Sequence, residues 1–281
     1  LILGTFQSTN RQALEAIKKL QEDGKIKGVG TNRNYLEALK HIAKHTTGNL
    51  RDLTKEQATQ YLVDRSIQVG QSSLNMSRQV MQHLIGDKLP VIKTEKNEVL
   101  GSRAYTPEQV KVIAEHQNER NALATQLSYA SGLRAHELLT LRTANEQPAN
   151  TRENHELKFS QREGEIYTVV GKGGLIREVL IPSKLATKLE QYKLNEPVKI
   201  TDRGIHYQQN YNIAGGRNWS NSFSKTSNRA FNWSRGAHGL RHTYAQERMK
   251  EIRAETQEIA LTIVSQEMGH FRPDITLTYL R

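Results

Sequence analysis

Six side chains in the second half of the sequence are of the types that phosphoryl transfer requires. They comprise two arginines, a lysine, two histidines and a tyrosine near the C-terminus, namely Arg134, Lys172, His238, Arg241, His270 and Tyr279. Taken singly, each has an ordinary structural explanation, such as a solvated loop for the lysine and core packing for the tyrosine. Taken together, they predict the attack of a hydroxyl on a phosphodiester without a divalent metal ion.

Four of these side chains suit the attack itself. The guanidinium groups of Arg134 and Arg241 can hold the non-bridging phosphate oxygens while negative charge builds on them. An isolated tyrosine hydroxyl is almost entirely un-ionised at neutral pH, so Tyr279 needs a base. His238 is our candidate for that base.

The leaving group and the phosphate need further hydrogen-bond and proton donors. The 5′ oxygen is a poor leaving group, and Lys172, in the glycine-rich turn GKGG, is the candidate to protonate it. His270 is the candidate donor of a hydrogen bond to a phosphate oxygen. Tyr279 follows His270 by nine residues, and the FRPD sequence between them predicts a turn that brings the two together.

Local patterns predict the elements that carry these residues. Thr106 and Pro107 mark the start of a helix, as its N-cap and its first residue. Alternating β-branched residues flank GKGG and predict a hairpin. The segments on either side have mostly helical patterns. Residues 106–281 are therefore predicted to form a mainly helical domain with a small antiparallel sheet.

The first part of the chain is predicted to be an all-helical domain. Four amphipathic segments separated by glycines lie within residues 1–86, and one begins with a capping box formed by Thr54 and Gln57. Residues 87–105 lack a clear period and are interpreted as a linker. The predicted fold class is therefore mainly α, with an all-helical first domain and a mixed second domain that carries the hairpin.

Composition indicates a polyanionic partner. The chain has 40 Lys and Arg against 29 Asp and Glu, a net charge of +11, which favours nucleic acid. No apolar run approaches the ~18 residues of a membrane span, and no signal peptide is visible, so we expect a soluble, cytoplasmic protein with no membrane partner. The lack of cysteine excludes thiolate nucleophiles and Cys-ligated zinc. No ordered carboxylate cluster predicts a metal site, and no cofactor is expected.

The motifs resemble those of a known family. The segments SGLRAHELLTLR, GKGG and HGLRHT, and MGH followed nine residues later by Tyr279, are similar in order and spacing to the motif boxes of the tyrosine recombinase, or phage integrase, family. Each box is moderately specific, and the ordered set is highly specific. The match covers residues 106–281, and residues 1–86 resemble the SAM-like core-binding domain of the family in character only. The resemblance implies two domains that form a clamp around DNA.

The family also implies roles for individual residues. Arg134 and Arg241 correspond to the catalytic arginines, and His238 and His270 to the active-site histidines. Lys172 corresponds to the general acid of the hairpin.

By the same resemblance, Tyr279 is the nucleophile that forms a 3′-phosphotyrosyl bond. Glu137 is the acidic residue of the first box and orients the catalytic side chains next to it. His242 and Tyr244 occupy packing positions. The implied function is site-specific recombination, and we favour integration or excision of a mobile genetic element over the resolution of chromosome dimers. The implied partners are double-stranded DNA, other copies of the chain in a tetramer on two DNA sites, and accessory directionality factors.

The sequence departs from the family pattern in two places. MGH replaces the commoner LGH, which conserves volume. The chain ends two residues after Tyr279, whereas family members usually continue into a tail that docks on a neighbouring protomer. Either this tail is missing here or assembly uses other contacts. Similarly, no β-rich arm-binding domain precedes residue 1, which favours a simple recombinase unless the N-terminus has been cut.

Two other functions use related features. A monomeric type IB topoisomerase-like enzyme would use the same residues to nick and reseal one strand. A DNA-binding protein without cleavage activity would keep the basic face and lose one or more of the six residues. The presence of all six argues against this last interpretation.

Overall fold

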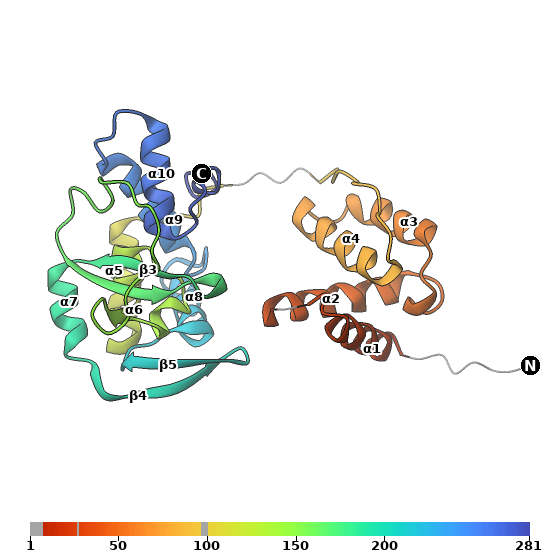
Figure 1. Ribbon diagram of the computed structural model, residues 1–281, viewed down its shortest axis with the longest axis horizontal. Coiled ribbons are helices and arrows are strands. Elements are labelled where there is room, and N and C mark those ends of the chain that lie inside the picture. Colours follow the sequence, from red (N-terminus) through yellow and green to blue (C-terminus); the bar gives the residue numbers. More distant parts are fainter. Residues whose placement is uncertain (1–7, 27, 97–100) are drawn as a thin grey trace, which may run out of the picture. The chain divides into compact units, whose positions relative to one another are not determined.

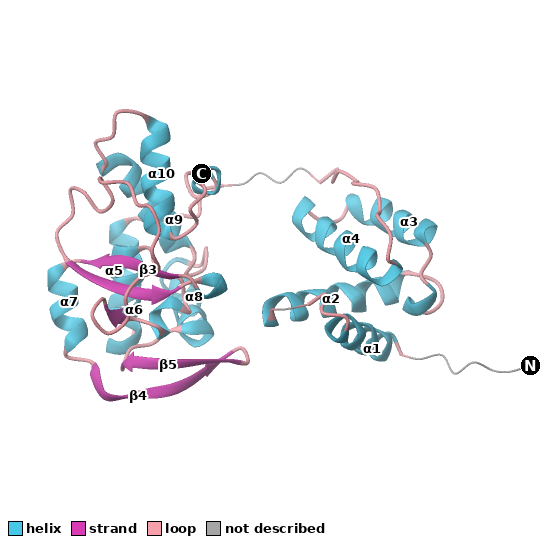
Figure 2. Cartoon of the chain, viewed as in Figure 1, coloured by secondary structure: helices cyan, strands magenta, loops and turns pink. Residues whose placement is uncertain are grey.

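The computed structural model describes residues 8–26, 28–96 and 101–281. The chain forms two compact units, Leu1–Val99 and Leu100–Arg281 (Figure 1). Figure 2 shows that both units are rich in helices and that the strands lie in the second. The predicted fold class, mainly α with little antiparallel sheet, is confirmed, although there are two small sheets where the sequence predicted one.

The first unit consists of helices, as predicted. They are α1 (Thr9–Glu22), α2 (Val29–His45), α3 (Lys55–Ser66) and α4 (Gln71–Ile85), with a short 3₁₀ turn η1 (Leu50–Asp52). The predicted capping box is present, since the Thr54 side chain accepts from Gln57 N and the Gln57 side chain accepts from Thr54 N. Apolar residues spaced along each helix form one core, with Leu39, Ile42 and Val80 fully buried.

Parts of the predicted linker are packed onto one unit or the other. Leu89 is buried in the core of the first unit, and the Thr94 hydroxyl is 2.9 Å from the main-chain oxygen of Ser66. Tyr105 is buried in the core of the second unit. Residues 97–100, which are also part of the predicted linker, lie outside the described residues.

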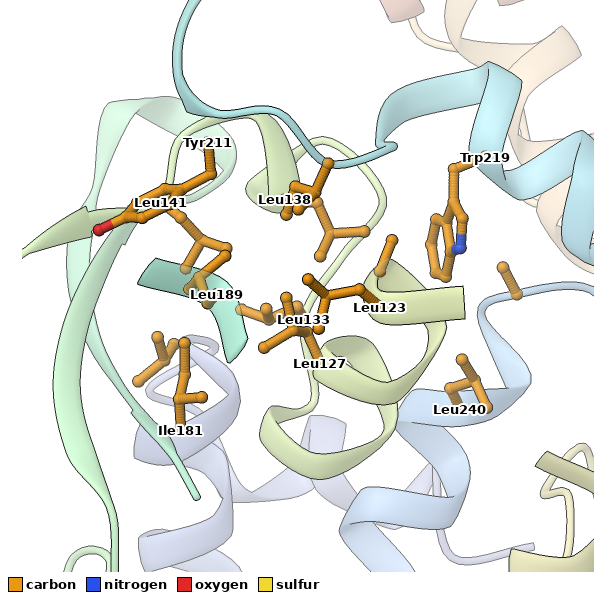
Figure 3. Packing of buried hydrophobic residues seen from close by; sticks show 14 of the residues in the cluster. Leu123, Leu127, Leu133, Leu138, Leu141, Ile181, Leu189, Tyr211, Trp219 and Leu240 are labelled. Atoms are coloured by element: carbon orange, nitrogen blue, oxygen red, sulfur yellow. The ribbon is translucent and has the colours of Figure 1, made fainter. Parts of the chain in front are cut away.

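The second unit surrounds one central helix. Its elements are α5 (Pro107–Glu115), α6 (Glu119–Ser131), η2 (Glu137–Leu139), β1 (Arg142–Thr143), β2 (Glu165–Val170), η3 (Lys172–Gly174), β3 (Ile176–Ile181), α7 (Ser183–Glu190), β4 (Lys193–Asp202), β5 (Ile205–Tyr211), α8 (Gly216–Phe231), α9 (Gly239–Glu251), α10 (Gln257–Met268) and α11 (Pro273–Leu277). Helix α6 packs against α5, α7, α8, α9 and β3. Figure 3 shows Leu123, Leu127 and Leu133 at the middle of the resulting core.

The sheets are built from two hairpins. Strands β2 and β3 pair antiparallel from Glu165 opposite Ile181 to Val170 opposite Ile176, with the GKGG turn between them and β1 on the outer edge of β2. This hairpin was predicted. The second hairpin, β4 and β5, was not predicted from the sequence.

A smaller apolar cluster closes the C-terminal end of this unit. It is formed by α9 and α10 together with Tyr279, whose side chain is 8% exposed. None of the helices in the described ranges is long and apolar enough to cross a membrane.

Candidate active site

The first site residue follows directly from the end of α6. That helix ends at Gly132 with φ 60° and ψ 32°, a left-handed conformation that favours glycine. An ideal Cβ at this position would also fall 2.7 Å from the Tyr244 ring, so no other residue fits. The turn directs Arg134 towards Glu137, which accepts hydrogen bonds of 2.7 Å from both the main-chain N and Nη1 of Arg134.

Glu137 is the centre of a buried charge cluster. Its side chain is inaccessible to solvent, and it receives a third hydrogen bond, of 2.8 Å, from Arg177 Nη2. Arg241 Nη1 lies 4.0 Å from the same carboxylate. Burial alone would raise the pKa of Glu137, but Arg177, Arg134 and Arg241 together hold this pKa well below its usual range. Three guanidinium groups thus share one carboxylate, which leaves an excess of two positive charges.

Arg241, on α9, is fully buried. Its Nη1 donates to the main-chain oxygen of Gly132, and its Nη2 lies 3.0 Å from both the main-chain oxygen of Met268 and His270 Nε2. Its Nε is also buried and has no acceptor among the described residues. Burial and the charge of Arg134 lower the pKa of Arg241 to about 10, so the side chain stays positively charged at neutral pH.

His270 follows the end of α10 and faces the arginine. Since Arg241 donates to Nε2, the proton of the neutral ring lies on Nδ1, which is buried and without a partner in the described part of the chain. Burial, Arg241 and Arg134 lower the pKa of His270 to about 3, so the ring is neutral at pH 7. It is therefore a hydrogen-bond donor at Nδ1 and not a second cation.

Tyr279 lies directly against this group. The chain turns through α11, and the Tyr279 ring stacks on His270 with ring centroids 5.1 Å apart and an interplanar angle of 16°. The guanidinium carbon of Arg241 lies 5.6 Å from the centroid of the Tyr279 ring. The structure therefore brings Tyr279, His270 and Arg241 together. Among the described residues, the Tyr279 hydroxyl has no hydrogen-bond partner.

Two further histidines border the tyrosine. His238, the N-cap of α9, is exposed on one side, and its ring centroid is 5.6 Å from that of Tyr279. His242 is buried, is nearer at 4.8 Å, and has an unpartnered Nδ1 within the described ranges. Desolvation lowers the pKa of both rings, with Arg241 as the next cause for His238 and Arg103 for His242. Both rings are neutral at pH 7 and can accept a proton.

Lys172 is the one predicted residue that the structure does not place in contact with the others. It lies in the exposed turn η3 and has no hydrogen bond or ion pair with any described residue. The turn nevertheless begins beside the cluster, because an ideal Cβ on Gly171 would lie 3.5 Å from Glu137 Oε1. The lysine is therefore attached next to the site and is free to change its rotamer.

Arg177 is a site residue that the sequence analysis missed. It is buried on β3, donates to Glu137, and donates through Nη1 to the main-chain oxygen of Glu267 at 2.6 Å. An ideal Cβ on Gly269 would fall 2.4 Å from Arg177 Cδ, so the arginine also lies under the turn that leads to His270. Arg177 shares its strand face with the buried Val179 and Ile181, and this alternation was the available signal.

Similarity to known proteins is found in three-dimensional structure. No family model matches the sequence, and no curated protein matches it either. A XerH site-specific recombinase bound to palindromic difH substrate is similar with a TM-score of 0.61 and 15% identity, covering 97% of this chain and 81% of that one. A lambda integrase dimer bound to a COC′ core site has a TM-score of 0.60 and 16% identity, covering 96% and 95%.

A third solved structure is also similar to this chain. The Tn1549 transposon integrase in complex with transposon right end DNA has a TM-score of 0.59 and 12% identity, covering 98% of this chain and 95% of that one. The chain has the fold of the tyrosine recombinases. At the level of fold, the resemblance drawn from the motif boxes is confirmed.

In this example of the tyrosine recombinase fold, a second buried charge network packs next to the Glu137 cluster and supports it. Glu267, at the end of α10, accepts two hydrogen bonds of 2.8 Å from Arg248 and one of 2.9 Å from the Tyr244 hydroxyl. Arg248 and Glu267 are both inaccessible to solvent. Because Arg177 donates to the main-chain oxygen of the same glutamate, this network connects directly to the Glu137 cluster.

Replacing Glu267 with glutamine is expected to destabilise the second unit by about 3–5 kcal/mol, since it removes the buried counter-charge of Arg248 and leaves only the partly exposed Glu251 as its ion-pair partner. Both tryptophans of the chain, Trp219 and Trp233, belong to this unit, so urea unfolding followed by tryptophan fluorescence reports on it alone. Glu115→Gln, which breaks an exposed pair with Lys111, is the matched control and should change little. Equal effects of the two changes would contradict this account of the network.

Stability should also fall as the pH is lowered from 7 to 5, partly because of His270. The pKa of this ring is about 3 in the folded chain and 6.5 ordinarily, so over this range the unfolded state binds more protons than the folded state. In His270→Gln, the loss of unfolding free energy between pH 7 and pH 5 should be smaller, by at most about 2 kcal/mol. The same fluorescence measurement checks this. The exposed His116→Gln should follow the unmodified chain.

Proposed function

We propose that this protein is a site-specific DNA recombinase that cleaves and rejoins duplex DNA through a 3′-phosphotyrosyl bond at Tyr279. The observation that carries the proposal is the position of Tyr279 on His270 and over Arg241, above a buried cluster with excess positive charge. Arg241 Nε and His270 Nδ1 are donors without acceptors in the described chain, so a phosphate oxygen would complete their hydrogen bonds. The fold and the net charge of +11 support DNA as the substrate.

His238, which is neutral at pH 7, accepts the proton of the Tyr279 hydroxyl in the same step in which that oxygen attacks, since the lowered pKa of the ring disfavours an earlier, separate transfer. The phenolic oxygen attacks phosphorus, and the bond between phosphorus and the 5′ oxygen breaks. Lys172 gives its proton to the departing 5′ oxygen, and rejoining reverses both proton transfers.

The remaining residues hold the reacting phosphate. Arg134 and Arg241 stabilise the charge on the non-bridging oxygens, and His270 donates from Nδ1. Glu137 and Arg177 act through these groups, because they fix Arg134 and the turn before His270.

The biological setting follows from the same likenesses. We propose that four copies act together on two DNA sites, and that the two units of each copy close around the duplex. The similarity to a transposon integrase and to a lambda integrase favours integration or excision of a mobile genetic element, with accessory factors setting direction. The absence of cysteine is compatible with action in the cytoplasm.

A covalent-capture experiment tests the proposal without knowledge of the target site. The full chain is incubated in EDTA with a library of duplexes that have randomised centres and a nick from which the cleaved end diffuses away. Adducts that survive detergent are sequenced, and mass spectrometry locates the modified residue. We expect one DNA motif and attachment at Tyr279. Sequence-selective binding without any adduct would overturn the proposal and favour a DNA-binding protein, and an adduct on a non-tyrosine side chain would overturn the mechanism.

A further inference from the structure

A shallow basic cleft, separate from the candidate active site, lies on the second unit next to the start of α9. It has a volume of about 550 Å³ and is lined by Arg103, Ser224, Asn228, Ser234, Arg235 and Gly236. The lining thus supplies two guanidinium groups, two hydroxyls and an amide, and no acidic side chain is among these residues. The cleft adjoins the candidate active site, because an ideal Cβ on Gly239, the residue after His238, would fall 2.4 Å from the main-chain oxygen of Arg103.

The two arginines of this cleft are held in place by neutral groups. Arg103 Nη2 donates to the main-chain oxygen of Arg235 at 2.9 Å, and Arg235 Nη1 donates to the main-chain oxygen of Ala104. The Arg235 guanidinium lies 4.8 Å from the ring centroid of Trp233, which in turn stacks on Tyr105 at 5.4 Å. Within the described part of the chain, neither arginine forms an ion pair.

Two guanidinium groups fixed close together without a carboxylate repel each other, so the arrangement favours an anion that can accept from both. The planar fork of each group matches the oxygens of a phosphate. Holding the forks with carbonyl oxygens and aromatic rings lowers the entropy that would be lost when the anion binds. The Asn228 amide and the Ser234 hydroxyl of the same cleft can donate to further phosphate oxygens, whereas the Ser224 hydroxyl donates to the main-chain oxygen of Ser220.

The surroundings favour a long polyanion over a small phosphate compound. Helix α8, which supplies Ser224 and Asn228, has no acidic residue along its length, and its exposed side carries Arg217, Lys225 and Arg229. Positive charge therefore continues from the cleft along the helix. A small ligand would not need this extension, whereas successive phosphates of a DNA strand would.

We infer that the cleft lined by Arg103 and Arg235 binds a backbone phosphate of duplex DNA beside the phosphate that the candidate active site cleaves. The inference rests on the proposed function for the identity of the DNA. It adds a contact made by Arg103, near the end of the predicted linker, and by the loop before α9. Such a contact would fix the register of the strand in the active site without reading sequence.

The test compares two double variants in binding to a duplex of arbitrary sequence, measured by fluorescence anisotropy over a range of KCl concentrations. Arg103→Ala with Arg235→Ala should weaken binding about tenfold or more at low salt and reduce the slope of log K against log salt by about one. The control, Lys184→Ala with Arg253→Ala, removes two exposed positive charges of the same unit that have no ion pair among the described residues. It should leave the slope nearly unchanged.

The outcomes separate this inference from the proposed function. A cleft variant that matches the control in affinity and slope overturns the inference, even if the unmodified chain forms its covalent adduct. A reduced slope with no adduct from the unmodified chain supports the cleft and contradicts the catalytic proposal. Titration with inorganic phosphate at constant ionic strength distinguishes a DNA-backbone contact from a site for free phosphate. If the site is for free phosphate, the cleft variant loses phosphate binding but keeps the salt dependence of its DNA binding. That result would also overturn the inference.

Discussion

Replacing Tyr279 with phenylalanine is expected to abolish the covalent adduct completely while leaving duplex binding unchanged. The hydroxyl has no hydrogen-bond partner among the described residues, so its removal costs no interaction within the chain. The ring itself packs in the cluster of α9 and α10 and stacks on His270, and phenylalanine preserves both contacts. The change therefore removes the proposed nucleophile with little structural effect.

Tyr244→Phe is the matched control for this change. Tyr244 is another buried tyrosine of the same cluster, and its hydroxyl donates to Glu267 at 2.9 Å. This variant should be less stable by about 1.5–3 kcal/mol, because one hydrogen bond to a buried carboxylate is lost, and should still form the adduct. If Tyr279→Phe retained the adduct, the nucleophile would be a different residue and the proposed mechanism would be wrong.

Arg241→Lys is expected to reduce the rate of adduct formation by about 10²–10³, although the positive charge is kept. The planar guanidinium of Arg241 donates to the main-chain oxygens of Gly132 and Met268, while its Nε has no acceptor in the described chain and is available to a phosphate. A lysine ammonium cannot reproduce this arrangement of donors. The remaining positive charge should preserve most of the affinity for duplex DNA, so the defect should be in the rate of the chemical step and not in binding.

Single-turnover rates at saturating protein measure this effect. Arg253→Lys, at an exposed position of the same unit, is the control and should react at the unmodified rate. Because Arg241 is fully buried, tryptophan fluorescence must show that the variant is folded under the conditions of the assay. A folded Arg241→Lys protein that reacts at the normal rate would remove Arg241 from the proposed mechanism.

Much of the fold could be predicted because local signals were strong. Thr54 forms the predicted capping box with Gln57, and Thr106 caps α5 as predicted, with Pro107 as the first helical residue. The β2–β3 hairpin was recognisable because β-branched residues flank both sides of a glycine-rich turn.

The β4–β5 hairpin lacked such signals. Nearly every residue of β4 is exposed or half-buried, so no apolar alternation marks the strand. Its turn has positive φ at both central residues, Arg203 and Gly204, and arginine is an unusual residue at the first of these positions.

The candidate site could be predicted as a set of residues and not as a geometry. Motif spacing selected Arg134, Arg241, His270 and Tyr279, and the last three meet in space. Motif spacing could not show that the buried Glu137 carboxylate holds the arginines together, because that depends on how η2, β3 and α9 pack against one another. For the same reason Arg177 was missed and His242 was taken as packing alone, although its ring is nearer to Tyr279 than that of His238.

The burial of Tyr279 affects the direction of the proposed reaction. In the free protein this side chain is part of the apolar cluster of α9 and α10, and keeping a side chain of this size out of water is worth roughly 1.5–3 kcal/mol. If attachment to DNA drew the ring out of this cluster, the proposed covalent intermediate would lose part of that burial. Repacking of the ring would then favour rejoining of the DNA and regeneration of the free protein.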